Sequence, residues 1–157
     1  RYLSLITKFK SNHNFKFLFA GKFEKKFNSF DIKKILIQDK INFEYLGYIE
    51  DMRKLLKNVD IVYFPSIYGE GIPKFLLEVI SCGIPILCSN TLANKYVVKH
   101  NKNGYVSDSI DQDYYYLDKL LNINKRLQFS NFARNLSCKK YDINIINDQH
   151  LNIYLLI

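Results

Sequence analysis

Short apolar runs alternate along this chain with longer stretches in which apolar and polar positions repeat at helical spacing. The apolar runs are rich in β-branched and aromatic residues and end at turn residues, which is typical of strands. They predict strands over residues 15–20, 41–46, 59–64, 84–88 and 104–106. The stretches between them predict helices over 2–10, 30–39, 51–58, 73–82 and 92–99, with two or three more from residue 111 onwards.

Strands that alternate with helices of this length favour βαβ units on a parallel sheet. We therefore predict an α/β fold, with a Rossmann-like parallel sheet flanked by helices. The chain has 157 residues, which fits one domain, and 48% of them are hydrophobic, which is enough to bury a core. No internal repeat or interdomain linker interrupts the pattern, and no apolar run approaches the ~20 residues that would span a bilayer.

Charge and reactive side chains narrow the function classes only a little. The formal net charge is +8. A basic chain attracts anions such as nucleic acid, an anionic membrane surface or a phosphorylated small molecule. The alternative is a solvated basic surface with no specific partner. The three cysteines have no metal or disulfide spacing, so we expect reduced thiols, with Cys82 and Cys88 as small core residues. The histidines are scattered, so we expect surface positions and no metal site: His13, His100 and His150.

The segment that carries most information is PSIYGEGIPKFLLEVISCGIPILCS, residues 65–89. A strand runs into a glycine-rich loop, and Pro73 then begins a helix. In an open α/β sheet, ligands bind where strands end and helices begin, because free amides and the helix dipole attract anions there. Glycines let the backbone approach a phosphate closely. The pattern predicts an anion site formed by Gly69, Gly71, Ile72, Pro73 and Lys74.

Two glutamates accompany this loop. Glu78 lies inside an apolar helical stretch and shares a face with Lys74, Ser81 and Cys82, so a polar stripe begins at the loop. Its carboxylate can accept two hydrogen bonds from a diol such as a ribose, or it can simply pair with Lys74 in solvent. Glu70 lies in the loop itself, where it either contacts sugar hydroxyls or is an ordinary loop carboxylate.

Two further residues at strand ends are candidates for donor binding. Lys22 follows the first strand and its Gly21, so its ammonium group could reach a phosphate, although a solvated basic loop is the competing interpretation. Tyr48 follows Gly47 at the end of the second strand and could stack on a base, although tyrosine is also common at the rim of a sheet.

The region around Glu70 and Glu78 resembles the E-x7-E region of the GT-B retaining glycosyltransferases of family 4. Further segments resemble that family's motifs in order and spacing, and these are FLFAG (17–21), FEYLGY (43–48), LLKNVDIVYFPS (55–66) and NGYV (103–106). The final helix, with LNIY at 151–154, resembles the family's C-terminal helix. The resemblance covers nearly the whole chain and is specific to the family, not to a substrate.

The resemblance implies the C-terminal, donor-binding half of a GT-B fold. It implies that Glu78 holds the ribose, that Glu70 lies near the donor sugar as the catalytic residue, and that the amides of Gly71 and Ile72 bind the diphosphate or the sugar. The donor would be a nucleotide diphosphate sugar, either a UDP- or a GDP-sugar. The glycosyl group would pass with retention to a glycan or lipid-linked acceptor, without a metal or cofactor.

Departures from the family pattern set further expectations. The family's basic diphosphate-gripping segment, the strand that carries it and the acceptor domain have no counterpart in residues 1–157. We therefore expect residues 1–157 to be an N-terminally truncated donor-binding domain that lacks the first strand and does not turn over alone. In addition, Asn94-Lys95-Tyr96 replaces a stretch where the family often carries a glutamate.

Other interpretations stay open. One is a degenerate or non-catalytic nucleotide-binding domain, and another is a sugar-nucleotide epimerase-like GT-B protein, which would be expected to place a histidine in the cleft. A nucleic-acid module would need basic residues interleaved with aromatics on one face, whereas the aromatics here mostly follow core periodicity, so we predict no nucleic-acid partner. We expect a cytoplasmic protein whose partners are the nucleotide sugar, the acceptor and an N-terminal acceptor domain, with peripheral contact at the inner membrane face as a hypothesis.

Overall fold

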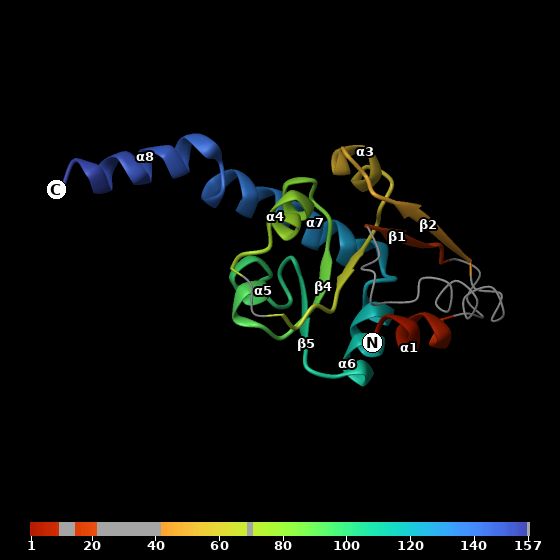
Figure 1. Ribbon diagram of the computed structural model, residues 1–157. Coiled ribbons are helices and arrows are strands. Elements are labelled where there is room, and N and C mark those ends of the chain that lie inside the picture. The colour runs from red at the N-terminus through yellow and green to blue at the C-terminus, as the bar shows by residue number, and fades with distance from the viewer. Residues whose placement is uncertain (10–14, 22–41, 69–70, 157) are drawn as a thin grey trace. The chain divides into compact units, whose positions relative to one another are not determined.

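A computed structural model describes residues 1–9, 15–21, 42–68 and 71–156. The chain forms two compact units, residues 1–52 and 53–157, and each is described by itself. Figure 1 labels the helices and strands along the chain. No helix of the described residues is long and apolar enough to cross a membrane.

The first unit packs one helix against a pair of parallel strands. Helix α1 covers Tyr2–Lys8, and strands β1 and β2 cover Phe17–Ala20 and Phe43–Gly47. The strands are in parallel register, with Phe17 opposite Phe43. Ile6 of α1 is buried against apolar side chains of the helix and both strands, namely Leu3, Phe17, Phe19 and Phe43. The alternating aromatic residues of both strands therefore build this small core.

The second unit holds a three-stranded parallel sheet in the order β3-β4-β5. Its strands are β3 (Val62–Phe64), β4 (Ile86–Ser89) and β5 (Gly104–Ser107). Helix α3 (Met52–Leu56) precedes β3, α4 (Lys74–Ser81) connects β3 to β4, and α5 (Leu92–Val97) connects β4 to β5. Three helices follow, α6 (Ile110–Lys119), α7 (Ile123–Lys140) and α8 (Ile143–Tyr154).

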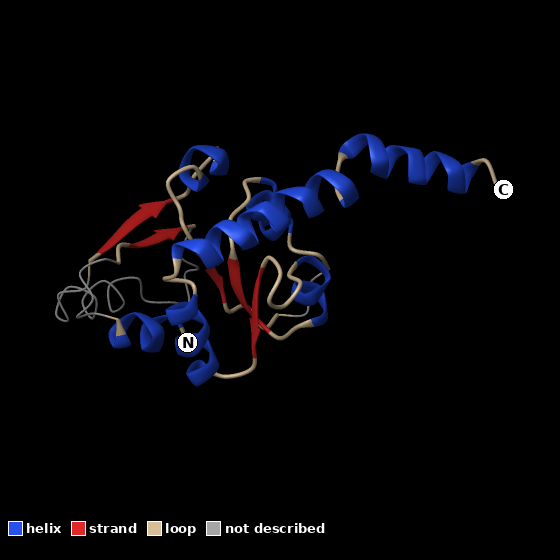
Figure 2. Cartoon of the chain, turned by 180° about the vertical axis from the view of Figure 1, so that it is seen from behind, coloured by secondary structure: helices blue, strands red, loops and turns tan. Residues whose placement is uncertain are grey.

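Strand β4 is the centre of this sheet, and every residue of it is buried. A strand covered on both faces is expected to be continuously apolar, as the sequence ILC at residues 86–88 is. Helix α7 packs along α4 beside the sheet, and Figure 2 shows this side of the unit. Leu76, Val79 and Ile80 of α4 and Phe129 of α7 have 0% exposed surface and form the centre of the core.

Local hydrogen bonds fix the starts of the helices. The side chains of Thr91, Ser109, Asn122 and Asp142 each accept a hydrogen bond from a backbone amide in the first turn of α5, α6, α7 and α8, respectively. These are the residue types that favour N-cap positions. Inside the unit, the hydroxyl of Tyr63 on β3 donates a 2.7 Å hydrogen bond to the carboxylate of Asp113, which is fully buried on α6.

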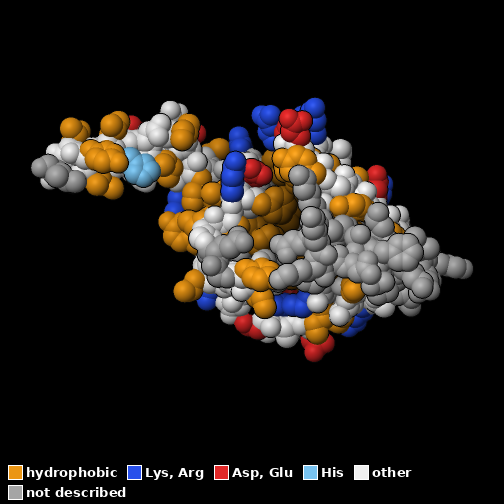
Figure 3. Space-filling view, in the orientation of Figure 1, with side chains coloured by type: hydrophobic (Ala, Val, Ile, Leu, Met, Phe, Trp, Pro, Cys, Tyr) orange, Lys and Arg blue, Asp and Glu red, His pale blue; other side chains and the backbone are white. Residues whose placement is uncertain are grey.

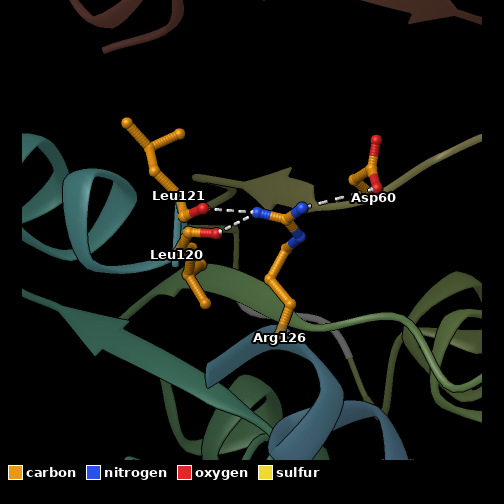
Figure 4. Close-up of polar contacts among 4 residues, drawn as sticks. All are labelled: Asp60, Leu120, Leu121 and Arg126. Carbon is orange, nitrogen blue, oxygen red and sulfur yellow. Dashed lines mark hydrogen bonds and ion pairs between the residues drawn. The ribbon is translucent and has the colours of Figure 1, made fainter. Parts of the chain in front are cut away.

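Two arginines join helix ends to the rest of the second unit. The guanidinium of Arg126 donates hydrogen bonds of 2.8 Å to the carbonyls of Leu120 and Leu121, just after α6, and lies 3.9 Å from a carboxylate oxygen of Asp60 (Figure 4). Arg134 on α7 donates a 2.6 Å hydrogen bond to the carbonyl of Ser81 at the end of α4. Both arginines satisfy carbonyls that a helix end leaves without intrahelical partners.

The predicted α/β fold is confirmed, and the elements differ from prediction mainly at their ends. Strand β4 begins at Ile86 rather than at Ile84, because Pro85 has no N–H to donate to the ladder. Strand β3 begins at Val62 rather than at Val59, whose amide instead closes a turn onto Leu56. The helix predicted over residues 30–39 lies outside the described residues. From residue 110 onwards there are three helices, as the longer alternative predicted.

The prediction that Cys88 is a core residue was right, and the same prediction for Cys82 was wrong. Cys88 on β4 is fully buried, as expected of a small apolar residue. Cys82 is exposed, because it follows the last turn of α4 on the polar side of that helix and not on the side that faces the core. The thiols of Cys82 and Cys138 are free.

Candidate active site at the β3–α4 edge

The carboxyl ends of β3 and β4 are tied together by a small polar network. The side-chain amide of Asn94, which is 2% exposed, donates to the carbonyl of Ser89 at 3.0 Å and to the hydroxyl of Ser89 at 3.1 Å. It also lies 3.5 Å from the carbonyl of Ser66, which accepts a hydrogen bond from the Ser89 hydroxyl as well. The network therefore anchors the start of the β3–α4 loop on the neighbouring strand.

The β3–α4 loop ends at the beginning of α4. Pro73 is the N-cap residue, with an extended backbone, and the described residues supply no side-chain cap there. Gly71, Ile72 and Lys74 are exposed at this helix start, and Pro73 is half-buried. A Cβ built on Gly71 would meet no atom within 4 Å, so the loop leaves open space at this point. Uncapped amides beside open space are a favourable position for an anion.

Glu78 lies on the outward face of α4, as the predicted polar stripe requires. The opposite face of the helix is buried, whereas the Glu78 side chain is 37% exposed and Lys74, one turn earlier, is 90% exposed. The Lys74 ammonium lies 3.9 Å from the Glu78 carboxylate, at the outer limit of an ion pair. The ion pair that the sequence left as an alternative is thus present but long, and it leaves the carboxylate accessible to a ligand.

The remaining predicted residues fall in different parts of the chain. Gly69, Glu70 and Lys22 lie outside the described residues, so their roles stay predictions. Tyr48 belongs to the first unit, directly after β2, and is 66% exposed. The second unit thus brings together Gly71, Ile72, Pro73, Lys74 and Glu78 at one helix start.

Sequence reasoning missed several residues at this edge. Asn94 was noted only as a departure from a family pattern. Its side chain contacts Ser66 and Ser89 in other loops, and the spacing of residues along the sequence does not predict such contacts. Ile67 and Tyr68 also escaped notice, although each is 72% exposed on the β3–α4 loop. The signal that could have found them is a pair of apolar residues directly after the Pro-Ser that ends β3.

The two described histidines, His100 and His150, do not belong to a cluster of metal ligands. His100 accepts a 3.1 Å hydrogen bond from the amide of Val106 and packs edge-on to the rings of Tyr105 and Tyr116. Both His100 and His150 are exposed, in agreement with the sequence prediction. Within the described part of the chain, no three His, Cys, Asp or Glu side chains group as metal ligands would.

A unit in which helices connect the successive strands of a parallel sheet belongs to the class of Rossmann-like α/β domains. Within that class, the chain belongs to the family described as glycosyl transferases group 1, whose model matches residues 1–136. Its α/β fold is that of the C-terminal, Rossmann-like domain of GT-B proteins. The resemblance seen in the sequence is therefore confirmed for the GT-B fold and for the group 1 glycosyl transferases, whereas retention and membership of family 4 stay predictions.

Individual relatives agree with this assignment. The chain is 34% identical over 85 residues to an Escherichia coli UDP-Gal:alpha-D-GlcNAc-diphosphoundecaprenol alpha-1,3-galactosyltransferase, covering 50% of this chain and 22% of that one. It is 32% identical over 118 residues to a Campylobacter jejuni N,N'-diacetylbacillosaminyl-diphospho-undecaprenol alpha-1,3-N-acetylgalactosaminyltransferase, covering 70% and 30%. Anabaena Alr3699/HepE, solved with UDP-glucose, has a similar fold, with a TM-score of 0.83 at 15% identity over 98% of this chain and 45% of that one. The chain thus matches less than a third of the length of these two curated relatives.

Proposed function

We propose that this chain binds a nucleotide diphosphate sugar at the start of α4, as the donor half of a glycosyltransferase. The observation that carries this proposal is the exposed Glu78 carboxylate one turn beyond the uncapped helix start at Pro73 and Lys74. Amides and a positive helix end suit a diphosphate, and a carboxylate at this distance along the helix suits the hydroxyls of a ribose.

Each candidate residue then has a specific role. The amides of Gly71 and Ile72 bind the diphosphate or the sugar, Lys74 adds positive charge, and Glu78 accepts hydrogen bonds from the ribose. Glu70, between Gly69 and Gly71, contacts the donor sugar as the catalytic residue. Tyr48 stacks on the base, and Lys22 approaches the phosphates. Donors aimed at the leaving diphosphate stabilise the charge that develops as the glycosidic bond breaks.

We further propose that residues 1–157 are part of a longer transferase. The described strands form one pair, β1-β2, and one set of three, β3-β4-β5. The support for this proposal is that the chain matches only 22% and 30% of the length of two curated relatives. The basic diphosphate-gripping segment and the acceptor domain would come from that longer polypeptide, so residues 1–157 alone would bind donor without transferring it.

The names of two relatives support a choice of donor and acceptor. Two curated relatives carry names that specify transfer to a diphosphoundecaprenol-linked sugar, and one of them names a UDP-sugar as donor. We propose a UDP- or GDP-hexose or N-acetylhexosamine as donor, a lipid-linked glycan as acceptor, and transfer with retention in polysaccharide biosynthesis. The protein would act in the cytoplasm, in peripheral contact with the inner face of the membrane.

Calorimetric titration of UDP, GDP and UDP-sugars tests this proposal, both with residues 1–157 and with the longer polypeptide. We expect one nucleotide to bind, and Glu78→Gln to weaken that binding about tenfold, the scale of one hydrogen-bonded contact of a charged group. Glu44→Gln, an exposed carboxylate on β2 beside Lys16, is the matched control and should bind as the wild type does. A folded protein that binds none of these nucleotides would instead be a degenerate or non-catalytic domain.

A further inference from the structure

A cluster of tyrosines and lysines lies on the second unit, where the end of α7 meets α5. The rings of Tyr96 and Tyr141 pack edge to face with centroids 6.4 Å apart, and the Tyr141 hydroxyl donates a 3.2 Å hydrogen bond to the Tyr96 carbonyl. The ammonium of Lys140 lies 4.0 Å from the centre of the Tyr96 ring, and that of Lys99 lies 5.6 Å from it. Two cations therefore share one aromatic ring.

An open hollow of about 740 Å³ lies beside this cluster and extends its positive charge. Lys95, Lys99 and Lys102 line it, and the ammonium of Lys102 lies 5.8 Å from the ring centre of Phe132. None of the predicted donor-site residues that the structure describes lines the hollow. We call the whole feature the Lys–Tyr patch, and its residues are Lys95, Tyr96, Lys99, Lys102, Lys140 and Tyr141.

The charge of the patch is not neutralised within the described part of the chain. None of its four lysines forms an ion pair there, and Lys99 instead donates a 3.2 Å hydrogen bond to the carbonyl of Lys95. One carboxylate, Asp108, also lines the hollow, where it accepts a 2.6 Å hydrogen bond from the side-chain amide of Asn90, and it offsets part of the positive charge of the three lysines there. The patch therefore offers several ammonium groups to an external anion.

The composition and openness of the patch identify the kind of anion. Tyrosine and lysine together are typical of the membrane–water interface, where the ring lies among headgroups and the ammonium reaches phosphate. Single-stranded nucleic acid needs free ring faces for stacking, whereas Lys140 and Lys99 already lie near the Tyr96 ring. Three lysines around an open hollow, with Lys140 above the neighbouring Tyr96 ring, suit many anionic headgroups better than one enclosed small ligand.

We infer that the Lys–Tyr patch binds the anionic phospholipid surface of a membrane. This inference rests on the proposed function, which brings the protein to a lipid-linked acceptor, and it assigns that contact to residues outside the donor site. Binding would be electrostatic and reversible, at about 1 kcal/mol per lysine near the surface. The hydrophobic side chains exposed along α8, which follows Tyr141 closely, are visible in Figure 3 and are not required for it.

Co-sedimentation with lipid vesicles tests the inference. The chain is mixed with phosphatidylcholine vesicles that contain either no charged lipid or phosphatidylglycerol. We expect binding only to the anionic vesicles, weakened about 30-fold in Lys99→Gln/Lys140→Gln. The control Lys54→Gln/Lys57→Gln removes the same charge from two exposed side chains at and just after α3, whereas Lys99 and Lys140 are half-buried, and it should bind as the wild type does.

The inference would be overturned if both double variants lost vesicle binding to the same extent, or if the protein bound neutral vesicles as well as anionic ones. It would also be overturned if inorganic phosphate displaced the protein from vesicles at an ionic strength at which chloride does not. Preferential binding of single-stranded DNA that the patch variant loses would also overturn it, in favour of a nucleic-acid surface. Nucleotide titration of the same variants keeps the two proposals separate. If the protein binds nucleotide but not anionic vesicles, only the membrane role of the Lys–Tyr patch is contradicted. If it binds anionic vesicles but no nucleotide, only the donor site is contradicted.

Discussion

The side-chain amide of Asn94 donates a 3.0 Å hydrogen bond to the main-chain carbonyl of Ser89, in a position that is 2% exposed. The same amide group approaches Ser66, so one side chain at the start of α5 holds the ends of two strands. Because the β3–α4 loop begins at Ser66, Asn94 positions the backbone that leads to the candidate donor site without itself being exposed to a ligand.

We predict that Asn94→Ala lowers the free energy of unfolding by about 1–3 kcal/mol, because it removes buried hydrogen bonds to the carbonyl and the hydroxyl oxygen of Ser89. Urea denaturation monitored by circular dichroism would measure this. The matched control is Asn90→Ala, which removes an exposed hydrogen bond to Asp108 and should cost less than about 1 kcal/mol. Equal costs for the two variants would contradict the role assigned to Asn94.

A second prediction concerns Arg126, which satisfies the carbonyls of Leu120 and Leu121 after α6. Arg126→Ala should lower the free energy of unfolding by about 2 kcal/mol, since hydrogen bonds from a charged donor are lost. Asp60→Asn should change stability by less than about 0.5 kcal/mol, because Asp60 is 81% exposed and 3.9 Å away. If Asp60→Asn cost as much as Arg126→Ala, the ion pair and not the carbonyl contacts would carry the effect.

Substitution by alanine should lower stability strongly at Gly104 and change it little at Gly71. A Cβ at Gly104 would collide with the backbone carbonyl oxygen of Ile86 on the neighbouring strand, so Gly104→Ala should cost about 3 kcal/mol. Gly71 has open space around it, so Gly71→Ala should change stability by no more than about 0.5 kcal/mol. Thermal unfolding of both variants checks this difference. If Gly71→Ala retains stability but loses nucleotide affinity, the loop approaches the ligand closely, as we propose.

The long contact between Lys74 and Glu78 should contribute little to folding. An exposed pair four residues apart on a helix contributes about 0.3–0.5 kcal/mol, and here the order of charges is the poorer one. We therefore predict that Lys74→Gln and Glu78→Gln each change the free energy of unfolding by no more than about 0.5 kcal/mol. A loss of about 2 kcal/mol in either variant, measured by urea denaturation, would mean that Glu78 has a structural role.

The sequence predicted the order of strands and helices because apolar periodicity and turn residues are local signals. It predicted the outward face of α4 for the same reason, since Glu78, Lys74 and Cys82 repeat at helical spacing. It placed Cys82 in the core wrongly, because an apolar neighbourhood in sequence does not specify the direction of a side chain that follows the last turn.

The contacts that sequence reasoning missed are those between distant segments. Asn94 and Ser66 are separated by 28 positions, and Tyr63 and Asp113 by 50, so no local pattern joins them. The Lys–Tyr patch likewise depends on α5 meeting the end of α7, as the 45 positions between Tyr96 and Tyr141 illustrate. Only the folded chain reveals such pairs, which is why the outward face of α4 could be predicted and the network that supports the β3–α4 loop could not.

The most direct test of the donor-site account asks whether Glu78 contacts the ribose. UDP and 2′,3′-dideoxy-UDP, or the guanosine pair if GDP is the ligand, would be titrated into the wild type and into Glu78→Gln. The account predicts that the substitution weakens UDP binding about tenfold but leaves dideoxy-UDP binding unchanged, because the hydrogen bonds to the carboxylate are already absent. Equal weakening of both ligands, or no weakening of either, would contradict the assignment of Glu78 to the ribose.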